Sequence, residues 1–279
     1  MSLFVTSLNS GSNGNCYYIG NDTEAVLIDA GISCRETERR MKRLGLSLSL
    51  VKAIFVSHEH IDHITGIPAL SKKYQLPVYI TEATLKNSNI PVQNHLIKNF
   101  QPDKTIMAGR LSVKPFPKSH DAADPYSFVI SFNKLNIGVF TDIGYACRNM
   151  KKYFPQCHAA FLEANYCENM LAKGNYPAHL KKRISSNKGH LSNTQALDLF
   201  IKHRGAHLSH IFLSHLSKNN NSPDLVQQLF NQHAGTTQVI VASRYHETPV
   251  FQIDDNKVPA IVKTRKNNPS ATRQLSLFQ

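Results

Sequence analysis

The stretch Ser57-His58-Glu59-His60-Ile61-Asp62-His63 gathers three histidines and an aspartate within a few positions. It comes directly after the apolar run Ala53–Ser57, which predicts a short buried strand that leads straight into the cluster. Imidazole is a ligand suited to zinc and other late divalent metals, and a carboxylate adds compensating negative charge. The stretch therefore predicts a metal site at a strand end. A solvated histidine-rich turn is the alternative.

The spacing within this stretch indicates two ions. His58 and His60 are two residues apart, so their side chains can point the same way from an extended loop. Asp62 and His63 lie slightly further along and can reach a second ion.

Short apolar runs alternate with helical patterns along the rest of the chain, which predicts an α/β protein. A predicted capping box at Ser33 and Glu36 opens a helix that Gly45 ends. The other predicted helices are Ile64–Tyr74, Thr194–His203 and Pro223–His233. The predicted strands besides Ala53–Ser57 are Leu3–Leu8, Cys16–Ile19, Ala25–Ile28, Ser127–Phe132, Asn136–Thr141, His158–Leu162, His210–Ser214 and Gln238–Ala242.

The motif HxHxDH after a strand resembles the signature of the metallo-β-lactamase superfamily. Four further segments resemble landmarks of that family and occur in the same order: Val26-Leu-Ile-Asp-Ala-Gly31, Lys118-Ser-His-Asp-Ala122, Phe140-Thr-Asp-Ile-Gly144 and Leu213-Ser-His-Leu-Ser217. The resemblance extends over most of the chain. It implies an α/β protein with the metallo-β-lactamase fold, an αββα four-layer sandwich.

The same resemblance implies a site with two divalent metal ions, zinc or manganese, and a metal-bridging hydroxide as the nucleophile. Asp142 would bridge the ions, and Asp29 would support the metal-binding loop from behind. The implied ligands are His58, His60, His120 and Asp142 for one ion and Asp62, His63, Asp142 and His215 for the other. Taken singly, His120 could be a surface histidine, and Asp142 or Asp29 an ordinary turn residue.

A histidine upstream of the last ligand resembles the proton donor of the phosphodiesterase branches. This is His190, in Gly189-His-Leu-Ser192, and the resemblance makes it the general acid. The chain also resembles a small bacterial branch, the YycJ/WalJ proteins, which is linked to 5′-exonuclease activity on DNA. The segments that carry this resemblance are Ser10-Gly-Ser-Asn-Gly-Asn15, Glu163-Ala-Asn-Tyr-Cys167, Gly174-Asn-Tyr-Pro177, Leu180-Lys-Lys-Arg-Ile184 and Gly189-His-Leu-Ser-Asn193. Glu163 and Asn165 would then support the metal ligands; Glu163 could equally be a strand-end carboxylate. Cys167 departs from this branch, where an aspartate is expected.

The chain is basic, with 32 Lys and Arg against 19 Asp and Glu and a formal net charge of +13. Phosphates attract such residues, so a nucleic-acid partner is the natural interpretation, although basicity can serve solubility alone. The candidates for holding a phosphate backbone near His190 are Lys181, Lys182, Arg183 and Lys188.

The segment 263–279 turns polar, and we expect it to be a flexible basic tail after a hydrolase domain at 1–262. It ends in a pentapeptide that resembles the peptide with which bacterial DNA-processing proteins bind the sliding clamp. Its candidate binding residues are Gln274, Leu275, Leu277 and Phe278. Five-residue motifs are common by chance, which is the alternative.

The sequence thus predicts a metal-dependent phosphodiesterase, a 5′-to-3′ DNA exonuclease in which Asp62 and His190 are catalytic. A small-molecule metallo-hydrolase for thioesters or lactams, a ribonuclease and a clamp-recruiting scaffold are the alternatives. Five scattered cysteines without CxxC spacing favour a reducing compartment, and the chain shows no signal peptide or membrane span. We therefore expect a cytoplasmic protein.

Overall fold

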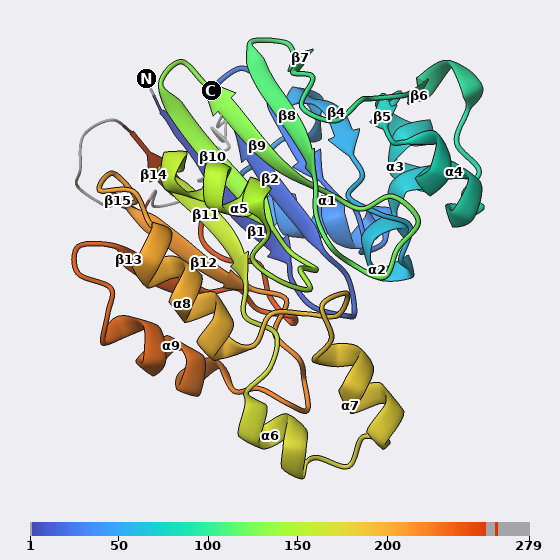
Figure 1. The fold of residues 1–279 in the computed structure, drawn as a ribbon. Coiled ribbons are helices and arrows are strands. Elements are labelled where there is room, and N and C mark those ends of the chain that lie inside the picture. The colour runs from blue at the N-terminus through green and yellow to red at the C-terminus, as the bar shows by residue number, and fades with distance from the viewer. Residues whose placement is uncertain (1, 255–259, 262–279) are drawn as a thin grey trace, which may run out of the picture.

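The computed structural model describes residues 2–254 and 260–261 of the chain. Within these residues two β-sheets lie face to face, and helices cover the outer face of each sheet (Figure 1). These four layers confirm the predicted αββα sandwich. Residues 263–279, with the proposed clamp-binding peptide, lie outside the described part.

The first sheet has eight strands, and the second has seven, in the described residues. The first runs in the order β15 (Ala260–Ile261), β14 (Phe251–Ile253), β1 (Leu3–Asn9), β2 (Cys16–Gly20), β3 (Ala25–Ile28), β4 (Val51–Phe55), β5 (Val78–Tyr79) and β6 (Ile97–Lys98). The second runs in the order β13 (Gln238–Val241), β12 (His210–Ser214), β11 (Ala159–Glu163), β10 (Leu135–Phe140), β9 (Tyr126–Phe132), β8 (Leu111–Pro117) and β7 (Ile106–Ala108). Neighbouring strands run parallel from β3 to β6 in the first sheet and from β10 to β13 in the second.

Helices occupy the two outer layers and the connections. The α-helices are α1 (Cys34–Arg43), α2 (Ile61–Ile64), α3 (Ile67–Tyr74), α4 (Glu82–Ser88), α5 (Arg148–Tyr153), α6 (Glu168–Lys173), α7 (Ala178–Ile184), α8 (Asn193–His203) and α9 (Pro223–Asn231). Short 3₁₀ turns span Leu48–Leu50, Asn94–Leu96 and Phe154–Gln156.

Three apolar layers hold the sandwich together. Between the sheets, Tyr17 packs against Phe161 with ring centroids 4.8 Å apart, and Phe55 meets Phe128 at 5.9 Å. A second layer joins the first sheet to α1 and α3, and a third joins the other sheet to α5, α8 and α9. Burial of these side chains removes apolar surface from water, which is the main driving force for the fold.

Most predicted elements are confirmed, with two corrections near the metal-binding stretch. The predicted single helix Ile64–Tyr74 is wrong: the chain forms α2 and α3, with a break at Gly66. The break lets the Gly66 amide donate to Ala30 O at 2.7 Å, and a Cβ there would lie 2.1 Å from Ile32 O. The capping box at Ser33 is half formed, because Glu36 binds Arg40 instead of the cap.

Three residues just past strand ends have left-handed backbones: Asp29 after β3, Asp142 after β10 and His215 after β12, with φ of 57°, 55° and 57°. This conformation is uncommon for residues other than glycine and gathers at functional sites. The strands β10 and β12 flank β11 in parallel, so their carboxyl ends share one edge of the sheet. The sharp turns therefore place polar side chains at that edge instead of continuing the sheet.

Gly31 is the point where three loops meet, and its replacement should show how closely they pack. A Cβ at Gly31 would lie 1.7 Å from Asp62 O, whereas one at Gly45 meets nothing within 4 Å. We expect Gly31→Ala to lower the free energy of unfolding by about 3 kcal/mol, since backbone atoms must move. Gly45→Ala should lower it by only about 1 kcal/mol, the cost of its positive φ. Urea denaturation of the metal-free protein measures both, and equal losses would contradict the close approach.

Candidate metal centre

The candidate metal ligands predicted from distant parts of the sequence converge in the structure. Their ligand atoms form overlapping groups within 4.8 Å of one another: His58, His60 and His120; His58, His63 and Asp142; and Asp62, His63 and His215. A fourth group holds Asp142, Glu163, His190 and His215. The sequence-predicted residues thus form one continuous cluster at the edge where the strands of both sheets end.

The first group consists of three imidazoles whose nitrogens face one another. His60 Nδ1 lies 3.1 Å from His58 Nε2 and 3.4 Å from His120 Nε2. Nitrogens that each bind a tetrahedral ion at about 2.0–2.1 Å stand about 3.4 Å apart, so this spacing suits one cation. His120 donates from Nδ1 to Gly189 O at 3.0 Å, which leaves Nε2 for a ligand. Burial lowers the pKa of His120 to about 4, so this imidazole is in the neutral, metal-binding form.

The second group joins the stretch after β4 to the end of β12. Asp62 Oδ2 lies 3.5 Å from both His63 Nε2 and His215 Nε2. The other nitrogen of His63 binds the buried Asp29 carboxylate at 2.7 Å. Asp29 also accepts from the Ser57 amide at 2.7 Å and from the Ser57 hydroxyl at 2.8 Å. The Asp29 contact fixes the ring of His63 so that Nε2 points into the cluster, an arrangement typical of carboxylates that orient metal-binding histidines.

Asp142 lies between the two groups. Its Oδ2 is 3.2 Å from His63 Nε2, and its Oδ1 is 3.2 Å from His215 Nδ1 and 3.9 Å from His120 Nε2. Within the described residues, the buried atoms Asp142 Oδ2 and His215 Nε2 have no partner in hydrogen-bonding geometry and make only the ion-pair contacts to His63 and Asp62. Buried polar atoms are rarely left unpaired, so the two atoms mark a space that a ligand would fill.

The protonation of the histidines in the cluster also indicates that a cation fits among the carboxylates. Burial would lower the pKa of His63, but Asp142, Asp29 and Asp62 outweigh it and raise that pKa to about 10. Asp142 likewise raises the pKa of His215 well above its ordinary value against the effect of burial. Protons on these rings supply the positive charge that the carboxylates require. Nitrogen and carboxylate donors around such a space fit divalent zinc or manganese.

Glu163 links His215 to His190. This fully buried carboxylate accepts at Oε1 from His190 Nδ1 at 2.8 Å and from His215 Nδ1 at 2.9 Å. Its Oε2 accepts from the Ile143 and Leu191 amides at 2.7 and 3.1 Å. Burial would raise the pKa of Glu163, but His190 and the other bonds lower it to about 2. Glu163 is therefore an ionised group that holds two histidine rings.

Asn165 also lies beside the cluster. Its Nδ2 donates to His215 O at 2.7 Å, which helps to hold the left-handed turn. Cys167 is the N-cap residue of α6, and its amide donates to Asn220 O at 2.8 Å.

Sequence reasoning missed Asn15 and gave Lys118 and Asp121 no role. Asn15 Nδ2 lies 3.1 Å from both Asp62 Oδ2 and His63 Nε2, and Lys118 Nζ donates to Thr141 O at 2.7 Å. Asp121 Oδ1 is 3.3 Å from His120 Nε2. Lys118 and Asp121 flank His120 in the quoted motif, which was the available signal. Asn15 ends the loop Ser10–Asn15, whose resemblance to the YycJ/WalJ branch assigned it no role, and it reaches the cluster from a turn far away in sequence.

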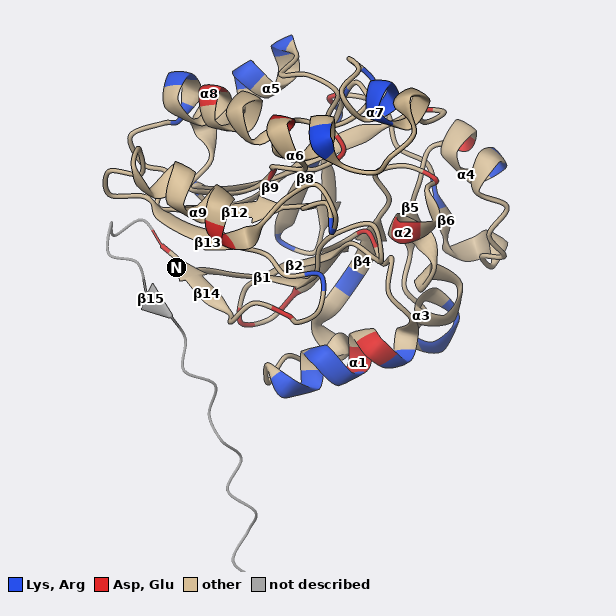
Figure 2. Ribbon diagram, turned by 90° about the horizontal axis from the view of Figure 1, so that it is seen from below, with Lys and Arg blue, Asp and Glu red and all other residues tan. Residues whose placement is uncertain are grey.

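The four basic residues proposed to hold nucleic acid differ in their surroundings. Lys181 donates to Ala172 O at 2.7 Å, and Arg183 binds Asp121 at 2.5 Å. Lys182 and Lys188 are exposed. The Arg183–Asp121 pair places α7 beside the candidate metal ligand His120, and Figure 2 shows Lys and Arg along α7. The basic helix α1 lies on the opposite side of the molecule in that view, and its Arg43 binds Glu247 at 2.7 Å.

Metal affinity should rise with pH. His63 and His215 hold protons at neutral pH in the metal-free protein, and a metal must displace them before it binds. We expect affinity for Mn²⁺ or Zn²⁺ to increase from pH 6 to pH 8 by about tenfold per pH unit for each proton released. Isothermal titration calorimetry in buffers of different ionisation enthalpy counts these protons. The His207→Gln variant, at an exposed histidine, is the control, and binding without proton release would contradict the assignment.

Comparison with known proteins supports the family suggested by the motifs. Residues 24–214 match the family described as the Beta-lactamase superfamily domain. The exodeoxyribonuclease YycJ of Bacillus anthracis is 34% identical over 94% of this chain and 99% of its own length. The exodeoxyribonuclease WalJ of Streptococcus pneumoniae is 32% identical over 81% of this chain and 87% of its own length.

Solved structures agree on the fold. The metallo-β-lactamase fold protein YhfI from Bacillus subtilis has a TM-score of 0.70 at 17% identity and covers 90% of this chain and all of its own. Zn²⁺-bound PqqB from Methylobacterium extorquens has a TM-score of 0.65 at 12% identity, over 88% of this chain and 99% of its own. In the described residues, no helix is long and apolar enough to cross a membrane. With its ligand cluster, its sandwich fold and these relatives, the chain belongs to the metallo-β-lactamase superfamily.

Proposed function

We propose that the protein is a metal-dependent phosphodiesterase that removes nucleotides from the 5′ ends of DNA. The observation that carries this proposal is the pair of histidines held by Glu163. One of them, His215, belongs to the metal cluster, and the other, His190, stands beside it with its side chain 17% exposed. A metal site with an adjacent, solvent-reachable proton donor suits hydrolysis of a phosphodiester.

The cluster would hold two divalent ions, zinc or manganese. His58, His60, His120 and Asp142 would bind one, and Asp62, His63, Asp142 and His215 the other. When bound, the ions supply Lewis acidity that activates a water and stabilises negative charge on the phosphoryl oxygens. The protein's own task is to keep this donor set rigid, which Asp29 and Glu163 perform from opposite sheets.

His190 would protonate the leaving oxygen. Its Nδ1 faces Glu163 at 2.8 Å, so the proton shared with the carboxylate sits on that side. Nε2 is then the nitrogen that can carry a second proton to the substrate. The centroid of the His190 ring lies 5.2 Å from those of His120 and His215. This proximity supports a donor that would serve both proposed ion positions.

DNA is the proposed substrate because two similar proteins, over most of their length, are named exodeoxyribonucleases. The basic surface of α7 beside His120 supports a polyanionic substrate. We further propose the cytoplasm as the compartment, since all five cysteines are free. Clamp binding by Gln274, Leu275, Leu277 and Phe278 stays a prediction, because these residues lie outside the described part.

Degradation of end-labelled nucleic acid tests this function. With Mn²⁺ or Zn²⁺ we expect stepwise loss of nucleotides from the 5′ ends of DNA, followed with 5′- and 3′-labelled duplexes and matched RNA. Asp62→Ala should abolish cleavage, because the second ion loses a carboxylate. His190→Ala should slow it by about a hundredfold or more, the usual contribution of a general acid.

The substrates and a control variant separate the alternatives. His207→Gln, at an exposed histidine, should cleave as the wild type does. Faster cleavage of RNA than of DNA would make the protein a ribonuclease. No metal-dependent cleavage of either would overturn the nuclease proposal and make thioesters and lactams the substrates to test.

The exposed lysines near α7 should contribute through charge alone. We expect Lys182→Gln to weaken DNA binding uniformly across sequences and to reduce the slope of log affinity against log salt by about one. Fluorescence anisotropy with the inactive Asp62→Ala protein measures this. Lys72→Gln on α3 is the matched control, and an unchanged slope for Lys182→Gln would remove Lys182 from the binding surface.

A further inference from the structure

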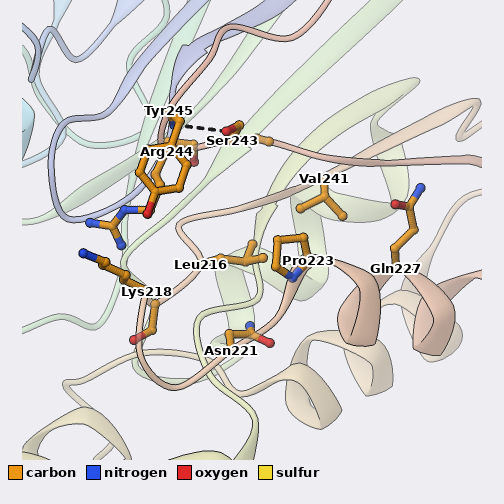
Figure 3. A pocket seen from close by; sticks show the side chains of 12 residues that line it. Leu216, Lys218, Asn221, Pro223, Gln227, Val241, Ser243, Arg244 and Tyr245 are labelled. Atoms are coloured by element: carbon orange, nitrogen blue, oxygen red, sulfur yellow. Dashed lines mark hydrogen bonds between the residues drawn. The ribbon is translucent and has the colours of Figure 1, made fainter.

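A cavity of about 480 Å³ lies next to the metal centre, between β12, β13 and α9 (Figure 3). We call it the side cavity; its walls include Ser10, Leu216, Lys218, Gln227, Val241 and Arg244. It opens at the carboxyl ends of the parallel strands β12 and β13, the same edge that carries the metal cluster. Ligands of parallel α/β sheets commonly bind at this edge.

The side cavity shares a wall with the metal cluster. Ser10 lines it, and the Ser10 hydroxyl accepts from the His215 amide at 2.8 Å. Leu216, the residue after His215, forms part of the same wall. The Ser10 amide donates to Ser243 O at 3.1 Å, so the far wall is tied to the same turn. The side cavity and the metal cluster therefore lie on two sides of the turn at His215.

The two ends of the side cavity differ in chemistry. In Figure 3 the charged ends of Lys218 and Arg244 point to one side, and Gln227 of α9 lies on the other. Leu216, Pro223 and Val241 lie between them and form an apolar floor. Such a site offers cations for a phosphate, flat apolar contact for a base and an amide for hydrogen bonds at the base edge.

Arg244 supplies the second observation that points to a ligand. Its Nη1 is buried and has no hydrogen-bond partner in the described residues. Its Nη2 donates to Ser12 Oγ at 3.4 Å. A guanidinium nitrogen without an acceptor is costly, and a phosphate oxygen is the acceptor that arginine binds best. The neighbouring Tyr245 is 59% exposed, and an aromatic ring at a cavity mouth suits stacking on a base.

We propose that the side cavity binds the nucleotide adjacent to the bond being cut, with its phosphate on Lys218 and Arg244 and its base against the apolar floor and Tyr245. This inference rests on the proposed phosphodiesterase function and adds a subsite that the metal ligands and α7 do not provide. Through this subsite the enzyme would contact a nucleotide of the strand beyond the phosphate that is hydrolysed. Arg244, Lys218 and Tyr245 then set affinity for polynucleotides and leave the chemistry at the metal centre unchanged.

Two substrates separate the side cavity from the metal centre. Bis(p-nitrophenyl) phosphate has no nucleotide to place in the cavity, whereas an oligonucleotide fills it. We expect Arg244→Gln to raise KM for the oligonucleotide about tenfold, as loss of a charged hydrogen bond does, with unchanged turnover of the small diester. Lys218→Gln should act in the same direction, and Lys72→Gln should change neither substrate. The subsite would be overturned if Arg244→Gln impaired cleavage of both substrates equally, or impaired cleavage of neither.

An abasic nucleotide tests the place of the base. In the wild type, removal of the base next to the scissile phosphate should slow cleavage about tenfold. In Tyr245→Ala the intact oligonucleotide should already be slow, and the abasic one should be no slower. Tyr245→Phe keeps the ring and should behave as the wild type does. An abasic penalty of the same size in wild type and Tyr245→Ala would exclude Tyr245 from base binding.

A binding measurement separates failure of this inference from failure of the proposed function. Thymidine 5′-monophosphate is titrated by calorimetry into the protein kept metal-free with EDTA, so that no metal ion contributes to the affinity. We expect binding that Arg244→Gln weakens about tenfold and His190→Ala leaves unchanged. Absence of nuclease activity with this binding intact would overturn the proposed function only. If the protein is a nuclease but Arg244→Gln binds thymidine 5′-monophosphate as tightly as the wild type does, the side cavity is not a nucleotide subsite.

Discussion

Two buried carboxylates that bind the far nitrogens of histidines hold the metal centre together. Asp29 at the end of β3 binds His63 Nδ1, and Glu163 at the end of β11 binds His215 Nδ1. Each carboxylate is fully buried and also accepts from backbone amides, so neither can rotate away. The rings therefore present Nε2 to the cluster in a fixed tautomer and direction. Because Asp29 belongs to one sheet and Glu163 to the other, the cluster depends on the sheets keeping their relative position.

The sandwich meets this requirement through its central apolar layer and through loops that touch backbone to backbone. Contacts such as Tyr17 with Phe161 fix the distance between the sheets. At the active edge, the Gly31 amide donates to Asn15 O at 2.8 Å, and the Asn15 amide donates to Asp62 O at 2.7 Å. Left-handed turns at Asp142 and His215 can persist only where neighbours restrain them so tightly. The rigidity of the core is in this way transmitted to the ligand atoms.

The sequence predicted the parts of this arrangement that depend on local pattern. The run Ala25–Ile28 matches β3 because apolar residues between turn signals leave few alternatives, and HxHxDH marked its cluster by composition alone. The local pattern could not show the break at Gly66, because this break depends on the close approach of Gly66 to Ile32 in another loop. Asn15 was missed for the same reason, and so was the side cavity, whose walls come from both ends of the chain. Contacts between distant segments carry no local signal.

The basic residues behind the net charge of +13 differ in whether a carboxylate binds them. Arg39, Arg40 and Arg43 on α1 bind Glu36 or Glu247, and Arg183 binds Asp121, so their charges are largely compensated. Arg244 differs because its buried Nη1 has no acceptor in the described residues, and it faces a cavity beside the metal cluster. A compensated arginine must give up a partner before it can bind phosphate, whereas Arg244 gains one. Affinity for a polyanion should therefore be concentrated beside the reacting bond, where binding also orients the strand for hydrolysis.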